Sequence, residues 1–151
     1  MHTTSILILA LLPVCHGILG LGRLQSVAVT GTLLCKKKPA SKVLVKLFDS
    51  DVFLDPELKR GRTDEDGTFL ISGWKREFTD IEPYLDIYHK CNYEGYCVKR
   101  RTIKIPEKYI ANAPYPNNTF DLGVLKLEGI HDDQWIDCTN LSVDQYRLHF
   151  F

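Results

Sequence analysis

Short stretches of alternating apolar and polar residues, separated by turn sequences, recur along most of this chain. Between residues 25 and 35, Val27, Val29 and Leu33 fall on one face and threonines on the other. The same period of two recurs in Lys42–Asp49, Thr68–Ser72, Tyr84–His89, Val98–Ile105 and Thr119–Leu127. The only helical candidate is a single turn at Pro106–Ala111. The pattern predicts an all-β fold: an antiparallel β-sandwich of about seven short strands with at most one short helical turn.

Length and charge exclude several classes of protein. The chain has 151 residues, of which 44% are hydrophobic and 25% are charged, a composition typical of one folded domain with a core. Lys and Arg total 19, and so do Asp and Glu, which leaves a formal net charge of zero. A balanced chain has no overall field that attracts nucleic acid, so we expect no nucleic-acid partner.

The N-terminus has the features of a secretory signal. Residues 1–20 contain no charged side chain and hold a short apolar run that is followed by Cys15 and Gly17. We expect cleavage after Gly17 or Gly20, because an uncleaved membrane anchor would need a longer apolar run. The predicted organisation is a signal peptide at 1–20, one domain at 21–129, and a C-terminal tail at 130–151 tied down by Cys138. The predicted location is extracellular, with no transmembrane segment.

Four cysteines remain after the signal is removed, as expected for an oxidising compartment. They are Cys35, Cys91, Cys97 and Cys138, and they allow three pairings. The short spacing between Cys91 and Cys97 favours a bridged turn between two strands, which leaves Cys35 to pair with Cys138. A zinc site is disfavoured because the paired CxxC spacing is absent.

Two sequons also fit secretion. Asn117-Asn118-Thr119 and Asn140-Leu141-Ser142 match the N-x-[ST] acceptor pattern. Asn117 lies in a proline-flanked loop, where a glycosylating enzyme could reach it. We predict that Asn117 and Asn140 are glycosylation sites.

Several ordered motifs resemble one known family. They are Val29–Cys35 (VTGTLLC), Val43–Asp49 (VLVKLFD), Thr63–Phe69 (TDEDGTF), Pro83–Asn92 (PYLDIYHKCN) and Phe120–Gly123 (FDLG). In order and spacing they resemble the transthyretin-like family described from nematodes, over about Leu21–Gly129. The resemblance implies a secreted transthyretin-like β-sandwich. It implies little chemistry, since some members are thought to act outside cells as binding or bridging factors.

A related branch of that superfamily hydrolyses 5-hydroxyisourate, so an enzyme is one alternative function. Its mark is a C-terminal Tyr-Arg-Gly-Ser, whereas this chain has Tyr146-Arg147-Leu148-His149. No motif unites His89, His131 and His149 into a set that could activate water. We therefore predict that the chain is not an enzyme.

Basic residues cluster at one expected strand. Lys99, Arg100, Arg101 and Lys104 form a candidate surface for an anionic lipid, a glycan or an acidic cell-surface protein. The competing interpretation is an edge strand protected by charge. Strand alternation places Lys99 and Arg101 on one face and Arg100 on the other.

The remaining alternatives concern small ligands and metals. A transthyretin-like fold could carry a small apolar ligand in a cleft between subunits, which would require an oligomer. Acidic residues crowd the loops around Asp51 and Asp64, but their spacing is not that of an EF-hand. We predict no metal and no cofactor.

Overall fold

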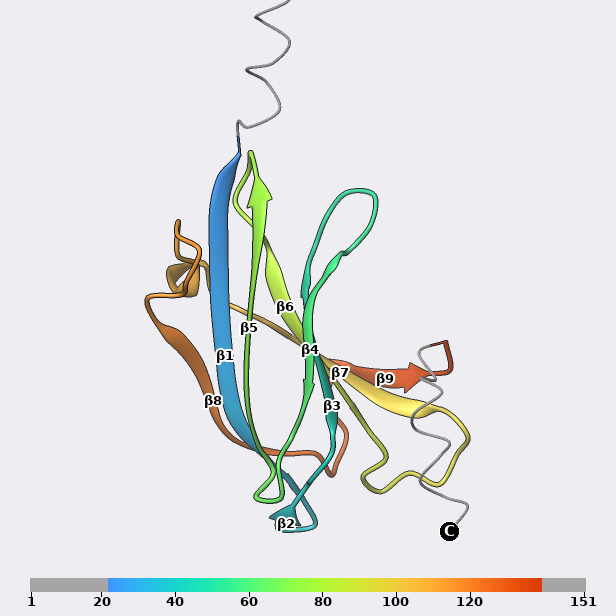
Figure 1. Cartoon of the computed structure of the whole chain (residues 1–151). Helices are drawn as coiled ribbons and strands as arrows, with labels where there is room; N and C mark the ends of the chain where they lie inside the picture. Colours follow the sequence, from blue (N-terminus) through green and yellow to red (C-terminus); the bar gives the residue numbers. More distant parts are fainter. Residues whose placement is uncertain (1–21, 140–151) are drawn as a thin grey trace, which may run out of the picture.

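The computed structural model describes residues 22–139, which form two β-sheets that share one core (Figure 1). The smaller sheet contains β1 (Arg23–Cys35), β2 (Lys38–Pro39), β5 (Thr68–Glu77) and β8 (Thr119–Lys126). The larger sheet has the order β4 (Glu57–Arg62), β3 (Leu44–Asp49), β6 (Pro83–His89), β7 (Val98–Lys104) and β9 (Gln134–Asp137). A 3-10 turn, η2, spans Glu107–Tyr109. The predicted all-β sandwich is confirmed.

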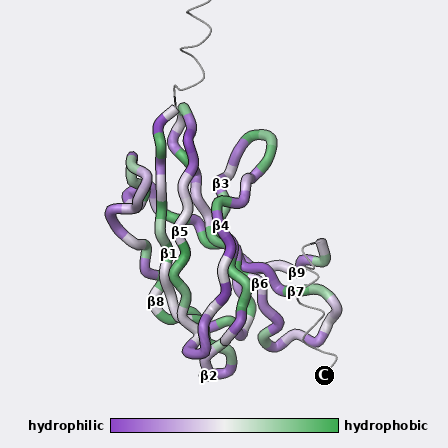
Figure 2. Tube along the Cα trace, in the orientation of Figure 1, coloured by the Kyte–Doolittle hydropathy of each residue, from purple (hydrophilic) through white to green (hydrophobic). Residues whose placement is uncertain are grey.

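The core lies between the sheets and is built from alternate positions of their central strands. Val27, Val29 and Leu33 of β1 are fully buried and face Val45 and Leu47 of β3 across the sandwich. The faces predicted for these strands from their alternation are correct. Figure 2 shows apolar and polar residues mixed along the strands.

Three strands lie where sequence patterning gives no signal. β4 occupies the C-terminal part of a segment that reads as an acidic connection, because an edge strand can be charged on both faces. β2 forms a tight hairpin with β1, in which Lys36 and Lys37 both adopt positive φ angles, of 51° and 66°. Hairpin turns of this kind usually carry Asn or Gly, so a lysine pair conceals the turn. The third, β9, lies in the expected tail.

The antiparallel prediction needs one correction. β8 pairs with β1 in parallel, with Val29 beside Phe120 and Leu33 beside Leu125. Parallel pairing follows from the long connection after β7, which includes η2 and brings Ala111 beside Ser26, so that β8 runs in the same direction as β1. All other strand pairs are antiparallel.

The disulfide pairing predicted from spacing is wrong. Cys35 is bonded to Cys91, with Cα atoms 5.7 Å apart, and Cys97 is bonded to Cys138, with Cα atoms 4.6 Å apart. Cys35 ends β1 and Cys91 follows β6, so the first bond joins the two sheets. The second bond follows from strand register: Val98 pairs with Asp137, which places Cys97 opposite Cys138. The short Cys91–Cys97 loop is therefore not closed on itself.

The predicted processing sites are only partly within the described residues. The signal peptide and Asn140 lie outside them, whereas Asn117 is exposed in the loop before β8. The first half of the predicted tail is an integral part of the larger sheet, because β9 pairs with β7. Between residues 22 and 139, no helix is long and apolar enough to cross a membrane.

Candidate functional site: the outer face of the larger sheet

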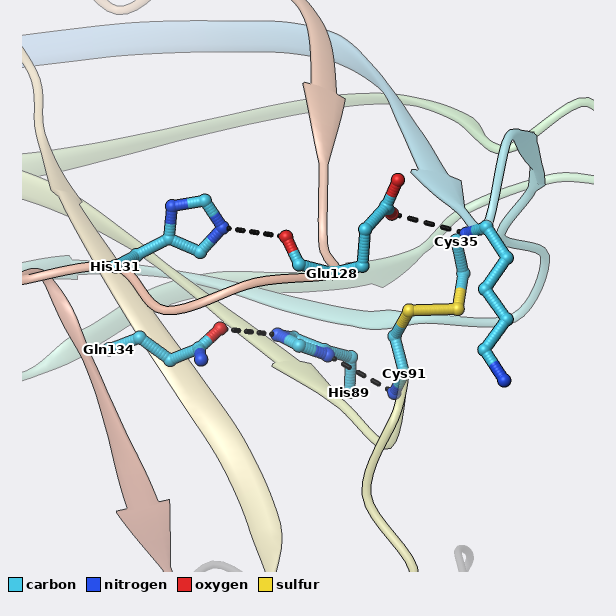
Figure 3. Close-up of a disulfide and its surroundings, with 7 residues drawn as sticks. Cys35, His89, Cys91, Glu128, His131 and Gln134 are labelled. Atoms are coloured by element: carbon cyan, nitrogen blue, oxygen red, sulfur yellow. Dashed lines mark hydrogen bonds between the residues drawn. A yellow bond between two sulfur atoms is a disulfide. The ribbon is translucent and has the colours of Figure 1, made fainter.

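Of the three histidines considered for catalysis, His89 is buried beside the disulfide that joins the sheets (Figure 3). The Cys91 backbone N–H donates to its Nδ1 at 3.2 Å, and its Nε2 lies 3.0 Å from Gln134 Oε1. Because Nδ1 accepts a hydrogen bond from the backbone N–H, Nε2 carries the ring proton and donates a hydrogen bond to the Gln134 side-chain oxygen. The ring is therefore neutral and has no free nitrogen with which to activate water.

Within residues 22–139, His131 does not complete a catalytic set with His89. His131 Nε2 lies 3.2 Å from the carbonyl oxygen of Glu128, as Figure 3 shows. His149 lies outside the described residues. The histidine contacts in the described part of the chain are those of a structural role, in which His89 positions the segment that carries Cys91.

Acidification is expected to destabilise the fold through His89. Burial lowers the pKa of His89 to about 4, against about 6.5 in an unfolded chain. As the pH falls from 6.5 to 4, the unfolded state takes up a proton that the folded state excludes, so stability falls with pH. This group should account for a loss of about 3 kcal/mol by pH 4. Urea unfolding between pH 4 and 7 measures it.

The matched control for that prediction is His89→Asn, which keeps a hydrogen-bond acceptor near the Cys91 N–H but cannot titrate. Carboxylates titrate in both proteins, so the difference between their pH profiles isolates His89. Identical profiles would show that the ring is not held neutral by its surroundings.

The outer face of the larger sheet is polar and centres on one arginine. Arg100 Nη1 lies 3.4 Å from Asp137 Oδ2 and 3.7 Å from Asp86 Oδ2, and its guanidinium stacks 4.4 Å from the Trp135 ring centroid. The Asp86 carboxylate also accepts hydrogen bonds from the Thr102 and Tyr88 hydroxyls. Register explains the grouping, since Tyr88, Arg100 and Trp135 are cross-strand neighbours.

Burial sets the electrostatics of this cluster. Asp86 is 1% exposed, and burial raises the pKa of its carboxyl group, an effect that the Thr102 hydrogen bond and the Arg100 charge oppose. Burial also raises the pKa of the neighbouring Tyr88 hydroxyl, and the Asp86 charge adds to the effect. Arg100 thus compensates two buried carboxylates, those of Asp86 and Asp137, and is an integral part of the sheet's structure.

A pocket of about 470 Å³ opens beside this cluster, over β6 and β7. Arg100, Thr102 and Lys104 of β7 line it, together with Tyr84 of β6 and Trp135 of β9. The loop before β4 closes one side through Asp55, whose carboxylate accepts a hydrogen bond from the Tyr84 hydroxyl at 2.8 Å. Burial and that contact raise the pKa of Tyr84, so the hydroxyl stays protonated at neutral pH. The pocket is preformed and combines cations, hydroxyls and ring surfaces.

The structure does not bring the four predicted basic residues into one patch. Arg100 and Lys104 face the outer pocket, whereas Lys99 and Arg101 lie on the opposite face, as the alternation predicts. Arg101 is held by Asp133, with Nε 3.0 Å from Oδ2. Lys104 is exposed, and no ion pair among residues 22–139 involves it. Of the four, Lys104 is therefore the cation best placed to meet a ligand.

The acidic loop considered for calcium is satisfied internally. Lys75 Nζ lies 2.9 Å from Asp49 Oδ2 and 3.4 Å from Asp51 Oδ2, so an ammonium group sits where a metal ion would otherwise compensate these charges. Within the residues that the structure describes, no group of three or more potential ligands could hold a metal ion.

Three pocket residues were missed by sequence reasoning. Tyr84 and Thr102 sit in predicted strands, but nothing in the sequence marks them as neighbours. Trp135 lies on β9, within the segment that the sequence predicts to be a tail. The usable signal was the pair Cys97 and Cys138: bonding them aligns β9 with β7 and brings Trp135 beside Arg100.

Fold and site together define a disulfide-linked β-sandwich of the transthyretin type with a polar pocket on one outer face. The transthyretin-like family model matches residues 30–106. Transthyretin-like protein 5 of Caenorhabditis elegans is 43% identical over 122 residues, which cover 78% of this chain and 87% of that protein. Transthyretin-like proteins 46 and 2 of the same organism are 39% and 38% identical, covering 86% and 80% of this chain and 73% and 86% of their own lengths. The chain belongs to the transthyretin-like family.

Proposed function

We propose that this chain is a secreted, non-enzymatic binding protein that holds an acidic glycan in the outer-face pocket. The observation that carries the proposal is the meeting of Lys104, Thr102 and Trp135 in one preformed cavity of about 470 Å³. The Lys104 ammonium group attracts a sulfate or carboxylate and can form a strong charge-assisted hydrogen bond with it.

The rest of the lining favours a sugar over other anions. Glu82 and Glu107 also line the pocket, and their carboxylates would accept hydrogen bonds from hydroxyl groups, which a sugar offers in greater number than a bare phosphate. Trp135 is 42% exposed and offers an apolar ring surface against which the C–H face of a sugar ring can pack. Mixed acids, cations and an aromatic ring suit a ligand that is rich in hydroxyls and also carries negative charge.

Three features support secretion. Residues 1–20 have the composition of a signal peptide, and the remaining four cysteines form two disulfides, which persist in oxidising compartments. The exposed Asn117 sequon is accessible to glycosylation. The non-enzymatic role is supported by the neutral, doubly hydrogen-bonded state of His89.

Replacing Lys104 tests the ligand class. Lys104→Ala should weaken binding to immobilised heparin-type glycans about tenfold, because a hydrogen bond to a charged group contributes about 1.5 kcal/mol or more. Lys99→Ala, on the other face of the same strand, is the matched control and should bind within twofold of wild type. Surface plasmon resonance at 50 and 200 mM salt measures both, and phosphatidylglycerol vesicles form a parallel arm.

The outcomes of that experiment are distinct. Vesicle binding that Lys104→Ala weakens, with no glycan binding by the wild type, would assign the pocket to a lipid headgroup. Equal losses in Lys99→Ala and Lys104→Ala would mean that charge acts without a specific pocket, and the proposal would be rejected.

A second candidate function is the transport of a small apolar ligand between subunits. It is favoured by the uncovered outer face of the smaller sheet, where Leu70, Trp74 and Val124 are 72%, 62% and 64% exposed. A ligand bound there would contact Trp74, whereas a ligand in the polar pocket would contact Trp135.

A further inference from the structure

The connection between β3 and β4 presents three consecutive apolar side chains to solvent. Val52, Phe53 and Leu54 are 90%, 92% and 80% exposed, although all three are large apolar side chains. Figure 1 shows this connection standing clear of both sheets, and Figure 2 shows its hydrophobic tip. We call residues Val52–Leu54 the apolar tip.

A set of hydrogen bonds at its base fixes the loop that carries the apolar tip. The Asp51 backbone N–H donates to Asp55 Oδ1 at 2.9 Å, and the Val52 N–H donates to Asp51 Oδ1 at 2.7 Å. The Tyr84 hydroxyl donates to the other oxygen of Asp55 at 2.8 Å. Lys75 fixes the same base through Asp49 and Asp51. Little ordering is therefore left for a binding event, which reduces its entropic cost.

A second exposed aromatic residue lies at the same end of the molecule. Phe78 is 73% exposed in the connection between β5 and β6, which Figure 1 places at the end of the sandwich from which the β3–β4 connection also projects. The apolar tip is a convex projection, not a groove. A convex apolar projection on a fixed base matches a deformable apolar medium better than a preformed protein surface.

The geometry points to a lipid surface as the occupant: we propose that the apolar tip inserts into the interfacial region of a membrane. Apolar side chains gain free energy when they leave water for the boundary between headgroups and acyl chains. The proposed glycan pocket opens at the base of the same loop, lined in part by Ser50 and Asp55, but insertion does not depend on it.

The charges near the tip determine which membranes it binds. The adjoining acids include Asp51, Asp55, Asp80 and Glu82, while Lys75 and Arg23 are held in ion pairs with acids. The base of the loop thus carries an excess of negative charge. Insertion should therefore favour zwitterionic phosphatidylcholine, and added phosphatidylglycerol should weaken it by repulsion.

Vesicle flotation tests the proposal with protein collected from the medium of expressing cells, its N-terminus checked by sequencing. Wild type should float with phosphatidylcholine vesicles at both low and high salt. Phe53→Ser/Leu54→Ser should reduce the bound fraction at least tenfold, whereas Val124→Ser/Ile130→Ser, which removes two exposed apolar residues elsewhere, should change it less than twofold. Lys104→Ala should float like wild type even if it loses glycan binding, so the two proposals can fail separately.

A tryptophan reporter gives a second readout. Phe53→Trp should show a blue shift in fluorescence when phosphatidylcholine vesicles are added, while the wild type, which keeps Trp74 and Trp135, should show little change. Failure of the wild type to float, or binding that needs phosphatidylglycerol and disappears in salt, would overturn the proposal. Equal losses in the two double-serine variants would do so as well.

Discussion

Replacing Cys35 and Cys91 together by alanine is expected to lower the free energy of unfolding by about 4 kcal/mol. The two cysteines are 56 residues apart in the sequence, so their bond removes much of the freedom of the unfolded chain. The bond also joins the two sheets, and Cys91 is 8% exposed within the core cluster. Chemical denaturation without reductant measures the loss.

Cys97→Ala/Cys138→Ala is the comparison for that experiment. Its loop of 41 residues predicts a similar entropic loss, but Cys138 is exposed, so little packing is removed with the bond. Cys35→Ala/Cys91→Ala should therefore lower the free energy of unfolding by at least as much as Cys97→Ala/Cys138→Ala. A loss below about 1 kcal/mol for Cys35→Ala/Cys91→Ala would contradict the role given to the inter-sheet bond. Peptide mapping that joined Cys91 to Cys97 would contradict the pairing itself.

Arg100→Ala is expected to destabilise the fold by about 3 to 5 kcal/mol at pH 7, because it removes a positive charge from beside two buried carboxylates. Asp86 and Asp137 are 1% and 6% exposed, and both lie within 4 Å of the Arg100 guanidinium. The removed charge opposes the rise in the pKa of Asp86, so the pKa should rise further in the variant. Protonation then relieves the penalty, and the difference from wild type should shrink as the pH falls.

Arg101→Ala is the matched control on the adjacent residue. Its partner, the Asp133 side chain, is 39% exposed, so solvent can replace the lost ion pair and the expected cost is at most about 1 kcal/mol. Thermal and urea unfolding of both variants at pH 5 and 7 would make the comparison. Equal costs for the two arginines would refute the special role of Arg100.

Much of the fold could be predicted because burial imposes a period on the sequence. The central strands β1, β3 and β6 must each present an apolar face to the core, so Val27, Val45 and Leu85 mark them clearly. Edge strands are under no such constraint. β4 and β9 are held by backbone pairing with one neighbour in the sheet, and their side chains carry no comparable signal.

The basic residues of the site could be predicted from the sequence, but the side chains that surround them could not. Arg100 and Lys104 were singled out by charge, and strand alternation assigned Arg100 to the face opposite Lys99 and Arg101. Alternation does not indicate which residues on the neighbouring strands contact Arg100. Asp86 lies on β6, the strand before β7, but Trp135 reaches Arg100 from β9, and the favoured disulfide pairing concealed that β9 pairs with β7.

The most direct test of the proposed binding site uses the two tryptophans of the chain, which lie on different sheets. Their indole N–H signals can be followed by NMR while a sulfated heparin disaccharide is added. Binding in the polar pocket predicts a saturable shift of the Trp135 signal, an unmoved Trp74 signal, and a loss of the effect in Lys104→Ala. A shift of Trp74 alone, or no shift of either signal, would contradict the assignment of the pocket to an acidic glycan.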